Sequence, residues 1–434
     1  MDYQQTVHSF QDQPEELEKL FSTAQNLHEI TQFTQAIDAE YAGSPQSLLF
    51  AAWHYRLRYA AQRLLEERPS INWALALPLS LLTGFTLWLI SDMNALFLDH
   101  IPYVFIFWSP IVALFVLAFF ALALRKNMGR YLLAAVGIAF AGAYVWLLAP
   151  RMAAPDHYLE LMAFHLPLLA WGAVAIGIMG ILAAYRERFA FLSKSVEVFV
   201  TGGVYVVVGL LFFGLSMTMF EVLNVNIDEV YLRLLVFGVG GAIPLLAVAG
   251  VYDPLRLPTE QQFSHGLGRV VPTLMRLLLP LVLIVFLIYV AAIPFNFMEA
   301  FENREALIVY NIMQFAVLGL LLGATPVFSD DLSETFQKWL RWGIVVLVLL
   351  ALLISLYALS AIVYRTLQDV VTINRMAFIG WNLINIGAFG LLLLRQWRYG
   401  RSRWLEGIQS TFSVTAVVYV IWALFILLAV PWLF

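Results

Sequence analysis

Residues 102–124, PYVFIFWSPIVALFVLAFFALAL, contain no charged side chain, and Arg125-Lys126 follow them directly. About 20 apolar residues in a helix are enough to cross the hydrocarbon core of a bilayer. Similar stretches recur along the chain at 71–91, 130–149, 163–185, 197–219, 230–251, 272–294, 306–327, 339–363, 376–395 and 411–433. Hydrophobic residues make up 62% of the chain and charged residues only 12%, far from the composition of soluble domains. The sequence therefore predicts an all-α, polytopic transmembrane helical bundle with about 11 spans.

Lysine and arginine residues are concentrated in every second connection between these spans. Nineteen fall in one set of connections, whereas the alternate set holds only Arg151, Arg304, Arg365 and Arg375, with Arg233 just inside a span. Connections rich in lysine and arginine face the cytoplasm. We therefore expect a multi-pass protein with its N-terminus in the cytoplasm and its C-terminus outside.

The predicted spans divide the chain into four segments. These are cytoplasmic amphipathic helices over 1–69, transmembrane helices 1–6 over 70–251, a cytoplasmic loop over 252–271, and transmembrane helices 7–11 over 272–434.

The cytoplasmic segment reads as a helical hairpin. A helix is predicted over 12–41, with Asp12 as N-cap and Glu15 completing a capping box. Its acidic polar face would be repelled by an anionic membrane surface, so we expect its apolar face to contact protein: the cytoplasmic loops, a second copy or a partner. A second helix is predicted over 44–67, where Trp53 and its arginines suit the membrane interface. This helix is interpreted either as a structural lead-in to the first span or as a recruitment element.

Polar side chains within the membrane are expensive to bury and are therefore candidates for function. They gather where the seventh to tenth spans approach the predicted outer surface. The candidate substrate-binding residues are Asn296, Glu299, Tyr310, Asn311, Gln314, Tyr357, Tyr364, Arg365, Asn374, Arg375, Asn382 and Asn385. One hypothesis is a polar pocket in the outer half of the bilayer. The alternative is hydrogen bonding between helices, for which asparagine and glutamine are commonly used.

The sequence gives little sign of catalytic chemistry. It has no cysteine and a formal net charge of −4 without a basic run, so we expect no thiolate metal site and no nucleic-acid partner. No nucleotide-binding or hydrolase motif is present. Six residues near the outer surface are of the types that bind metals: Asp99, His100, Asp156, His157, Glu160 and His165. Nothing fixes their geometry, so neither a metal nor a cofactor is predicted.

Short motifs between residues 266 and 395 resemble a family of uncharacterised bacterial polytopic inner-membrane proteins, known as a domain of unknown function. They are Leu277-Leu278-Leu279-Pro280-Leu281 leading to Tyr289, Leu356-Tyr357-Ala358-Leu359, Tyr364-Arg365 and Thr372-Ile373-Asn374-Arg375. The family tends to have a glycine before that threonine, where this chain has Val370-Val371. The resemblance implies a bacterial inner-membrane location and no established activity.

Three functions remain open on the sequence alone. The first is a transporter or lipid-handling protein with a polar pocket among helices 7–10. The second is a non-catalytic scaffold or sensor that binds a protein partner through its N-terminal helices, with membrane lipids around its spans. The third is a membrane-embedded enzyme, for which Glu299, Glu302 and the residues around His157 are the only support. The sequence favours a non-enzymatic role.

The predicted orientation can be tested with a reporter fused after Phe434. Alkaline phosphatase, which is active only outside the cytoplasm, should be active in this fusion, and green fluorescent protein should not be fluorescent. The opposite pair of results would reverse the assigned sidedness.

Overall fold

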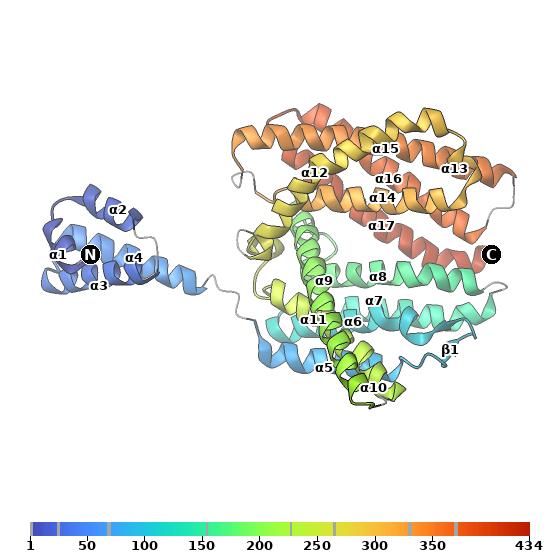
Figure 1. The fold of residues 1–434 in the computed structure, drawn as a ribbon, viewed down its shortest axis with the longest axis horizontal. Coiled ribbons are helices and arrows are strands. Elements are labelled where there is room, and N and C mark those ends of the chain that lie inside the picture. The colour runs from blue at the N-terminus through green and yellow to red at the C-terminus, as the bar shows by residue number, and fades with distance from the viewer. Residues whose placement is uncertain are drawn as a thin grey trace. The chain divides into compact units, whose positions relative to one another are not determined.

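A computed structural model describes residues 3–23, 27–66, 71–152, 155–225, 228–263, 266–328, 332–368 and 372–434. The chain divides into two compact units, Met1–Ser70 and Ile71–Phe434. Helices make up almost all of the described residues (Figure 1). The prediction of an all-α helical bundle is confirmed.

The N-terminal unit contains four helices: α1 (Tyr3–Ser9), α2 (Pro14–Thr23), α3 (Leu27–Gly43) and α4 (Leu48–Glu66). The predicted hairpin of two helices is therefore wrong, since both α2 and α3 lie where one helix was expected over 12–41; residues 24–26 lie outside the described residues. The backbone N–H of Leu17 donates to the carbonyl of Gln13 at 3.2 Å, so Gln13 rather than Asp12 precedes α2. Pro14 suits the first helical position because it has no N–H to satisfy.

The apolar faces of these helices pack against one another. Trp53 of α4 is only 5% exposed, and its ring centroid lies 5.5 Å from that of Phe21 and 5.4 Å from that of Phe33. Arg56 stacks over Trp53 and donates to both carboxylate oxygens of Glu18 at 2.5 and 3.1 Å, and this pairing raises the pKa of Arg56. The Trp53 ring is therefore packed inside this unit, and the placement of its helix at the membrane interface stays a prediction.

The second unit contains the apolar helices. They are α5 (Trp73–Leu89), α6 (Tyr103–Leu124), α7 (Met128–Leu148), α8 (Pro155–Met179), α9 (Tyr185–Val222), α10 (Glu229–Arg233), the π-helix η2 (Leu234–Val239), α11 (Gly240–Val251), α12 (Leu267–Ala292), α13 (Glu299–Glu302), α14 (Arg304–Ala324), α15 (Glu334–Gln368), α16 (Ile373–Tyr399) and α17 (Trp404–Leu433). Short 3-10 turns are η1 (Ala149–Arg151), η3 (Pro258–Glu260) and η4 (Ile293–Asn296). A two-residue strand β1 (Leu96–Phe97) pairs antiparallel with β2 (Ile101–Pro102) between α5 and α6.

Ten helical segments among the described residues are long and apolar enough to cross a membrane. Ten of the predicted spans fall on them. The span predicted at 71–91 corresponds to α5, which is a shorter apolar helix of 17 residues. The multi-pass membrane character of the chain is thus confirmed.

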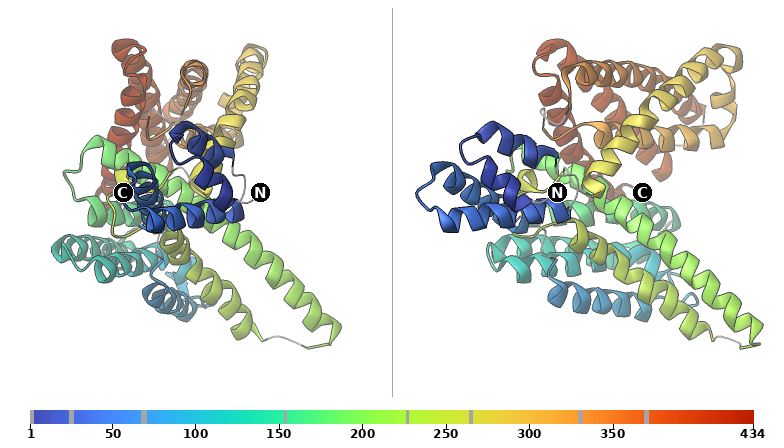
Figure 2. Two further views of the ribbon diagram at one scale, coloured as in Figure 1. Left: turned by 90° about the vertical axis from the view of Figure 1, so that its left-hand side faces the viewer. Right: turned by 60° about the vertical axis from the view of Figure 1, so that its left-hand side comes forward.

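Two hydrophobic cores lie side by side in this unit. One is formed mainly by α5–α8 and α11 with the end of α17, and the other by α12 and α14–α17. The long helix α9 contacts α11 of the first group and α12, α14 and α17, which contribute to the second (Figure 2). Large apolar side chains remain exposed on α9 and α12, such as Phe212 at 71% and Leu281 at 60%. Such surfaces suit the hydrocarbon of a bilayer rather than water.

Glycines allow α5 to approach η2 and α11 closely. A Cβ atom added to Gly84 would overlap the backbone carbonyl oxygen of Gly238. A Cβ on Gly241 would lie 2.8 Å from a methyl carbon of Leu87. Small residues permit such backbone contacts between membrane helices, so this crossing depends on glycine at these positions.

We expect Gly84→Ala to destabilise the protein by about 1–3 kcal/mol, the usual range for overpacking a tight contact. Thermal unfolding of the purified protein in detergent would measure the effect. Gly137→Ala on α7 is the matched control, because a Cβ there meets nothing within 4 Å. Equal unfolding temperatures for the two variants would contradict the close contact.

Candidate functional site

Four amide side chains connect α14 to α16. Asn311 and Gln314 are three residues apart on α14, and Asn382 and Asn385 are three apart on α16, so each pair lies on one helix face. The Nδ2 of Asn382 donates to the Oδ1 of Asn311 at 2.7 Å, and the Nε2 of Gln314 donates to the Oδ1 of Asn382 at 2.8 Å. The Nδ2 of Asn385 donates to the Oε1 of Gln314 at 2.6 Å. We call this chain of four residues the amide ladder.

The amide ladder is satisfied at both ends. The hydroxyl of Tyr419 on α17 donates to the Oδ1 of Asn385, and the Nδ2 of Asn311 donates to the carbonyl of Leu307 at 2.8 Å. All four amides are at most 5% exposed. Hydrogen bonding between helices is therefore the structural role of these residues. Gln314, Asn382 and Asn385 are not among the residues that line the cavity described next.

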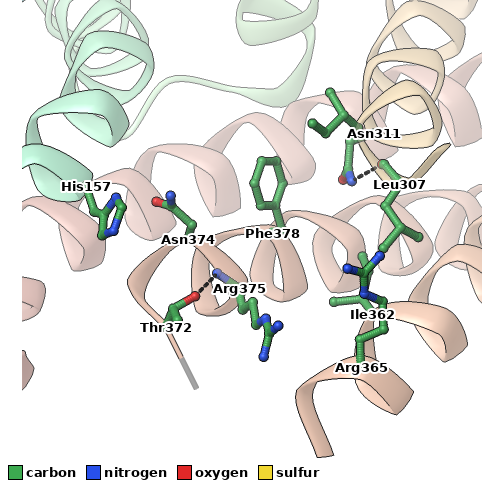
Figure 3. A pocket seen from close by; sticks show the side chains of 10 residues that line it. His157, Leu307, Asn311, Ile362, Arg365, Thr372, Asn374, Arg375 and Phe378 are labelled. Carbon is green, nitrogen blue, oxygen red and sulfur yellow. Dashed lines mark hydrogen bonds between the residues drawn. The ribbon is translucent and has the colours of Figure 1, made fainter. Parts of the chain in front are cut away.

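A cavity of about 330 Å³ lies where α8, α14 and α16 begin and α15 ends (Figure 3). We call it the arginine pocket, and this end of the bundle the pocket end. Its lining residues are His157, Leu307, Ile308, Asn311, Ile362, Arg365, Thr372, Asn374, Arg375 and Phe378. The volume is at the lower end of the range for small-molecule sites. Asn311, Arg365, Asn374 and Arg375 are the candidate residues that the structure brings together here.

Two polar atoms of the arginine pocket are buried without a partner among the described residues. They are the Nη1 of Arg365 and the Oδ1 of Asn374. Within the described part of the chain, no carboxylate lies within 4.0 Å of the Arg365 guanidinium. Buried polar groups in native proteins are nearly always hydrogen-bonded, so these two atoms are exceptions among the residues that line the pocket.

The first turn of α16 forms one wall of the pocket. The side chain of Thr372 caps the helix by accepting a hydrogen bond from the backbone N–H of Arg375 at 3.3 Å. The helix begins at Ile373, so Asn374 and Arg375 lie in its first turn rather than in the loop that the sequence suggests. Figure 3 shows Asn374 on the side of this turn that faces His157, and Arg375 on the side nearer Arg365.

Three tyrosines among the candidate residues belong to an aromatic cluster at the same end of the bundle. The hydroxyl groups of Tyr310 and Tyr289 are hydrogen-bonded, and the hydroxyl of Tyr357 donates to the carbonyl of Phe297 at 2.7 Å. Tyr364 lines a second, more open cavity of about 400 Å³ together with Arg365. Arg365 therefore separates the two cavities, whereas Tyr310 and Tyr357 pack beside them.

Two candidate residues lie away from both cavities. Asn296 is exposed in η4, where its Nδ2 donates to the carbonyl of Ala292 at 3.4 Å. Glu299 is exposed on α13 and accepts from the Nδ2 of Asn303 at 3.3 Å. Neither residue lines either of the two cavities, and their role in substrate binding stays a prediction.

Sequence reasoning missed His157 and the apolar wall as pocket residues. His157 precedes the rest of the site by about 150 residues or more, so no spacing pattern connects it to α14–α16. Leu307, Ile308, Ile362 and Phe378 are ordinary residues of apolar spans and carry no signal of their own. Thr372 could have been found from its position as a helix-capping residue before an apolar run.

The residues of metal-binding type are dispersed. His100 lies 2.8 Å from Asp156, and His157 lies 3.8 Å from Glu160. His165 is buried on α8, where its Nδ1 contacts the carbonyl of Leu161 and its Nε2 accepts from the indole of Trp381. Among the described residues, no three histidine, aspartate or glutamate side chains form a group that could hold a metal ion.

No family model matches this chain, and comparisons with curated proteins and with solved structures give no match either.

We expect Asn382→Leu to destabilise the protein by about 1–3 kcal/mol, because Asn311 and Gln314 would each lose a buried partner. Chemical unfolding in detergent would measure the loss. Asn296→Leu provides the control, since that side chain is exposed and outside the amide ladder. The ladder would be refuted if both variants unfolded at the same denaturant concentration.

Proposed function

We propose that this protein handles lipids: the arginine pocket binds the polar head of an amphiphile, and the apolar chains lie along the exposed side of α14. The observation that carries this proposal is Arg365, which lines the cavity and whose buried Nη1 has no partner among the described residues. Unpaired charges are expensive near a membrane, and where they persist they commonly mark ligand or ion sites.

An apolar surface continues directly from the pocket. Ile308 lines the cavity and is 41% exposed, and its neighbours Val309 and Ile312 are 60% and 63% exposed. A bound molecule with a polar head at Arg365 would therefore find hydrocarbon-compatible side chains within one turn of α14. This combination favours an amphiphile over a fully polar solute.

The hydrogen bonds of the amide ladder favour binding of a ligand in the pocket over transport of a solute along the interface between α14 and α16. Asn311 lines the pocket and is also the first residue of the ladder, beyond which Asn382, Gln314 and Asn385 are buried and bonded to one another. A solute moving from the pocket along the α14–α16 seam would have to break these bonds. The transporter hypothesis would thus require a rearrangement of this seam.

The distribution of arginines and lysines predicts that the pocket end faces outward. We therefore propose that the pocket takes lipid from the outer leaflet of a bacterial inner membrane, in keeping with the resemblance noted from the short motifs.

A scaffold or sensor role for the N-terminal unit is the second candidate. The observation in its favour is that α1–α4 bury a core of their own, centred on Phe33 and Trp53. A unit with its own core suits a module that binds a protein partner.

A photoactivatable phospholipid incorporated into native membranes would test the lipid-handling proposal. We expect it to label peptides from 304–312 and 372–378. Ile308→Trp fills the apolar mouth of the pocket and should reduce that labelling several-fold. Ile284→Trp is the control, because Ile284 is an exposed residue of α12 (54%) that lies outside these peptides and lines neither cavity.

A variant lacking residues 1–66 should be labelled like the full chain, since the N-terminal unit plays no part in the proposed pocket. Equal labelling of the Ile308→Trp and Ile284→Trp variants would contradict lipid handling. If only the shortened variant impaired the biological role of the protein in cells, the scaffold or sensor function would be favoured instead.

A further inference from the structure

Cationic side chains gather at the end of the bundle opposite the pocket end, where α15 begins and α16 ends. Residues 334–343 and 395–406 contain six lysine or arginine residues and two glutamates. Two of the arginines are used within the protein, since Arg395 donates to two hydroxyl groups of α17 and Arg403 pairs with Glu406 at 2.9 Å. Three exposed cations have no carboxylate within 4.0 Å among the described residues, and we call them the cation cluster: Lys338, Arg398 and Arg401.

A hydrogen-bonded junction joins the helix ends that carry the cation cluster. The Nε and Nη2 of Arg341 on α15 donate to the side-chain oxygen and the backbone carbonyl of Gln396 on α16, at 3.1 and 3.2 Å. The Nε2 of Gln396 donates in turn to the carbonyl of Trp404 on α17 at 2.6 Å. Gln396 is buried, so one amide holds three helix ends together. Each member of the cation cluster lies within five residues of Arg341 or Gln396 along the chain, so the cluster is gathered around this junction.

Exposed tryptophans accompany the cation cluster. Trp339 and Trp342 are three residues apart on α15, and therefore lie on one face of that helix, and Trp397 lies on α16. Their side chains are 75%, 65% and 81% exposed. Tryptophan is enriched where membrane helices pass from hydrocarbon to the head-group region. Exposed indoles next to cations therefore suit the surface of a bilayer better than bulk water.

The spacing along α15 and α16 places these tryptophans about one membrane thickness from the arginine pocket. Trp342 precedes Arg365 by 23 residues, and Trp397 follows Asn374 by 23 residues. At 1.5 Å per residue, such a stretch of helix is about 35 Å long, slightly more than the roughly 30 Å hydrocarbon core of a bilayer. Both helices can therefore cross the hydrocarbon with the pocket at one interface and the tryptophans at the other. The cation cluster lies beyond Trp342 and Trp397 along the two helices, at the level of the head groups.

We propose that the cation cluster and its tryptophans bind anionic phospholipid head groups in the leaflet opposite the arginine pocket. Anionic leaflets attract lysine and arginine residues that lie close to their surface. The partner is a lipid rather than a soluble anion, because the tryptophans place the cations at the membrane surface. This proposal does not depend on the lipid-handling function of the arginine pocket, which lies at the other ends of the same helices.

Native mass spectrometry of the full-length protein in a neutral detergent would test the proposal with two phospholipids of identical acyl chains. The probes are dioleoyl phosphatidylglycerol, which is anionic, and dioleoyl phosphatidylcholine, which is zwitterionic. We expect the wild-type protein to bind phosphatidylglycerol more tightly. Arg398→Gln combined with Arg401→Gln should weaken that binding about tenfold to thirtyfold, because each cation next to anionic head groups strengthens binding roughly fivefold.

The matched control is Arg125→Gln combined with Lys126→Gln. This variant also removes two exposed cations, but from the connection between α6 and α7, which belong to the other hydrophobic core. It should change the binding of phosphatidylglycerol less than twofold. A measurement that needs no variant is a roughly tenfold rise in salt concentration, which should reduce the preference of the wild-type protein because salt screens exposed charges.

The arginine pocket can be excluded as the source of the signal with Ile308→Trp, which fills the mouth of that pocket. We expect this variant to keep the preference for phosphatidylglycerol. Loss of the preference in Ile308→Trp, with no loss in the Arg398→Gln and Arg401→Gln double variant, would overturn the proposal and assign the anionic lipid to the pocket. Equal binding of the two lipids by the wild-type protein would also overturn it. An equal loss in both double variants would show that overall charge, not this cluster, attracts the lipid, and the proposal would be wrong.

Discussion

Hydrocarbon offers no hydrogen-bonding partner, and this constraint acts on every polar group of the apolar unit. It makes the spanning segments helical, because a helix satisfies its backbone within one segment. For the same reason, the polar side chains between α14, α16 and α17 are hydrogen-bonded to one another. Asn382 both donates to Asn311 and accepts from Gln314, so a single amide uses both of its groups across the helix interface. A leucine at position 382 would remove the donor to the Oδ1 of Asn311 and the acceptor of the Nε2 of Gln314.

Charged side chains of the described residues meet this constraint to different degrees. On α9, Lys194 and Glu197 are both buried and are joined at 2.7 Å, so each charge is compensated by the other. Arg365 has no such partner within the described residues. The two sites differ in their surroundings, since Arg365 borders cavities that an anion can enter. Its buried Nη1 has no partner among the described residues, as is also true of the Nε of Arg130 and of Arg188, but Arg365 in addition lines a cavity.

Hydropathy predicted ten of the membrane helices because each is long enough to be read independently of its neighbours. It did not separate α2 from α3, where the apolar spacing runs through both. For the site, the spacing of Asn311, Gln314, Asn382 and Asn385 predicted which faces are polar. Whether those faces meet each other or a cavity depends on how α14 and α16 are rotated, which is a property of the packed bundle. His157 lies on α8, so only the fold brings it to the pocket.

The hydrogen bonds of the amide ladder fix which way the Asn311 amide group is turned in the wall of the arginine pocket. Asn311 faces the cavity while its Oδ1 is held by Asn382, and its Nδ2 is held by the carbonyl of Leu307. If the Asn311 amide were rotated by 180°, its NH2 group would face the NH2 group of Asn382 in place of an acceptor. The Asn382 amide would then have to rotate as well. The same requirement passes to Gln314 and Asn385 and then to the hydroxyl of Tyr419. The orientation of Asn311 is thus coupled to α17, so the amide that it presents to the pocket has a fixed orientation.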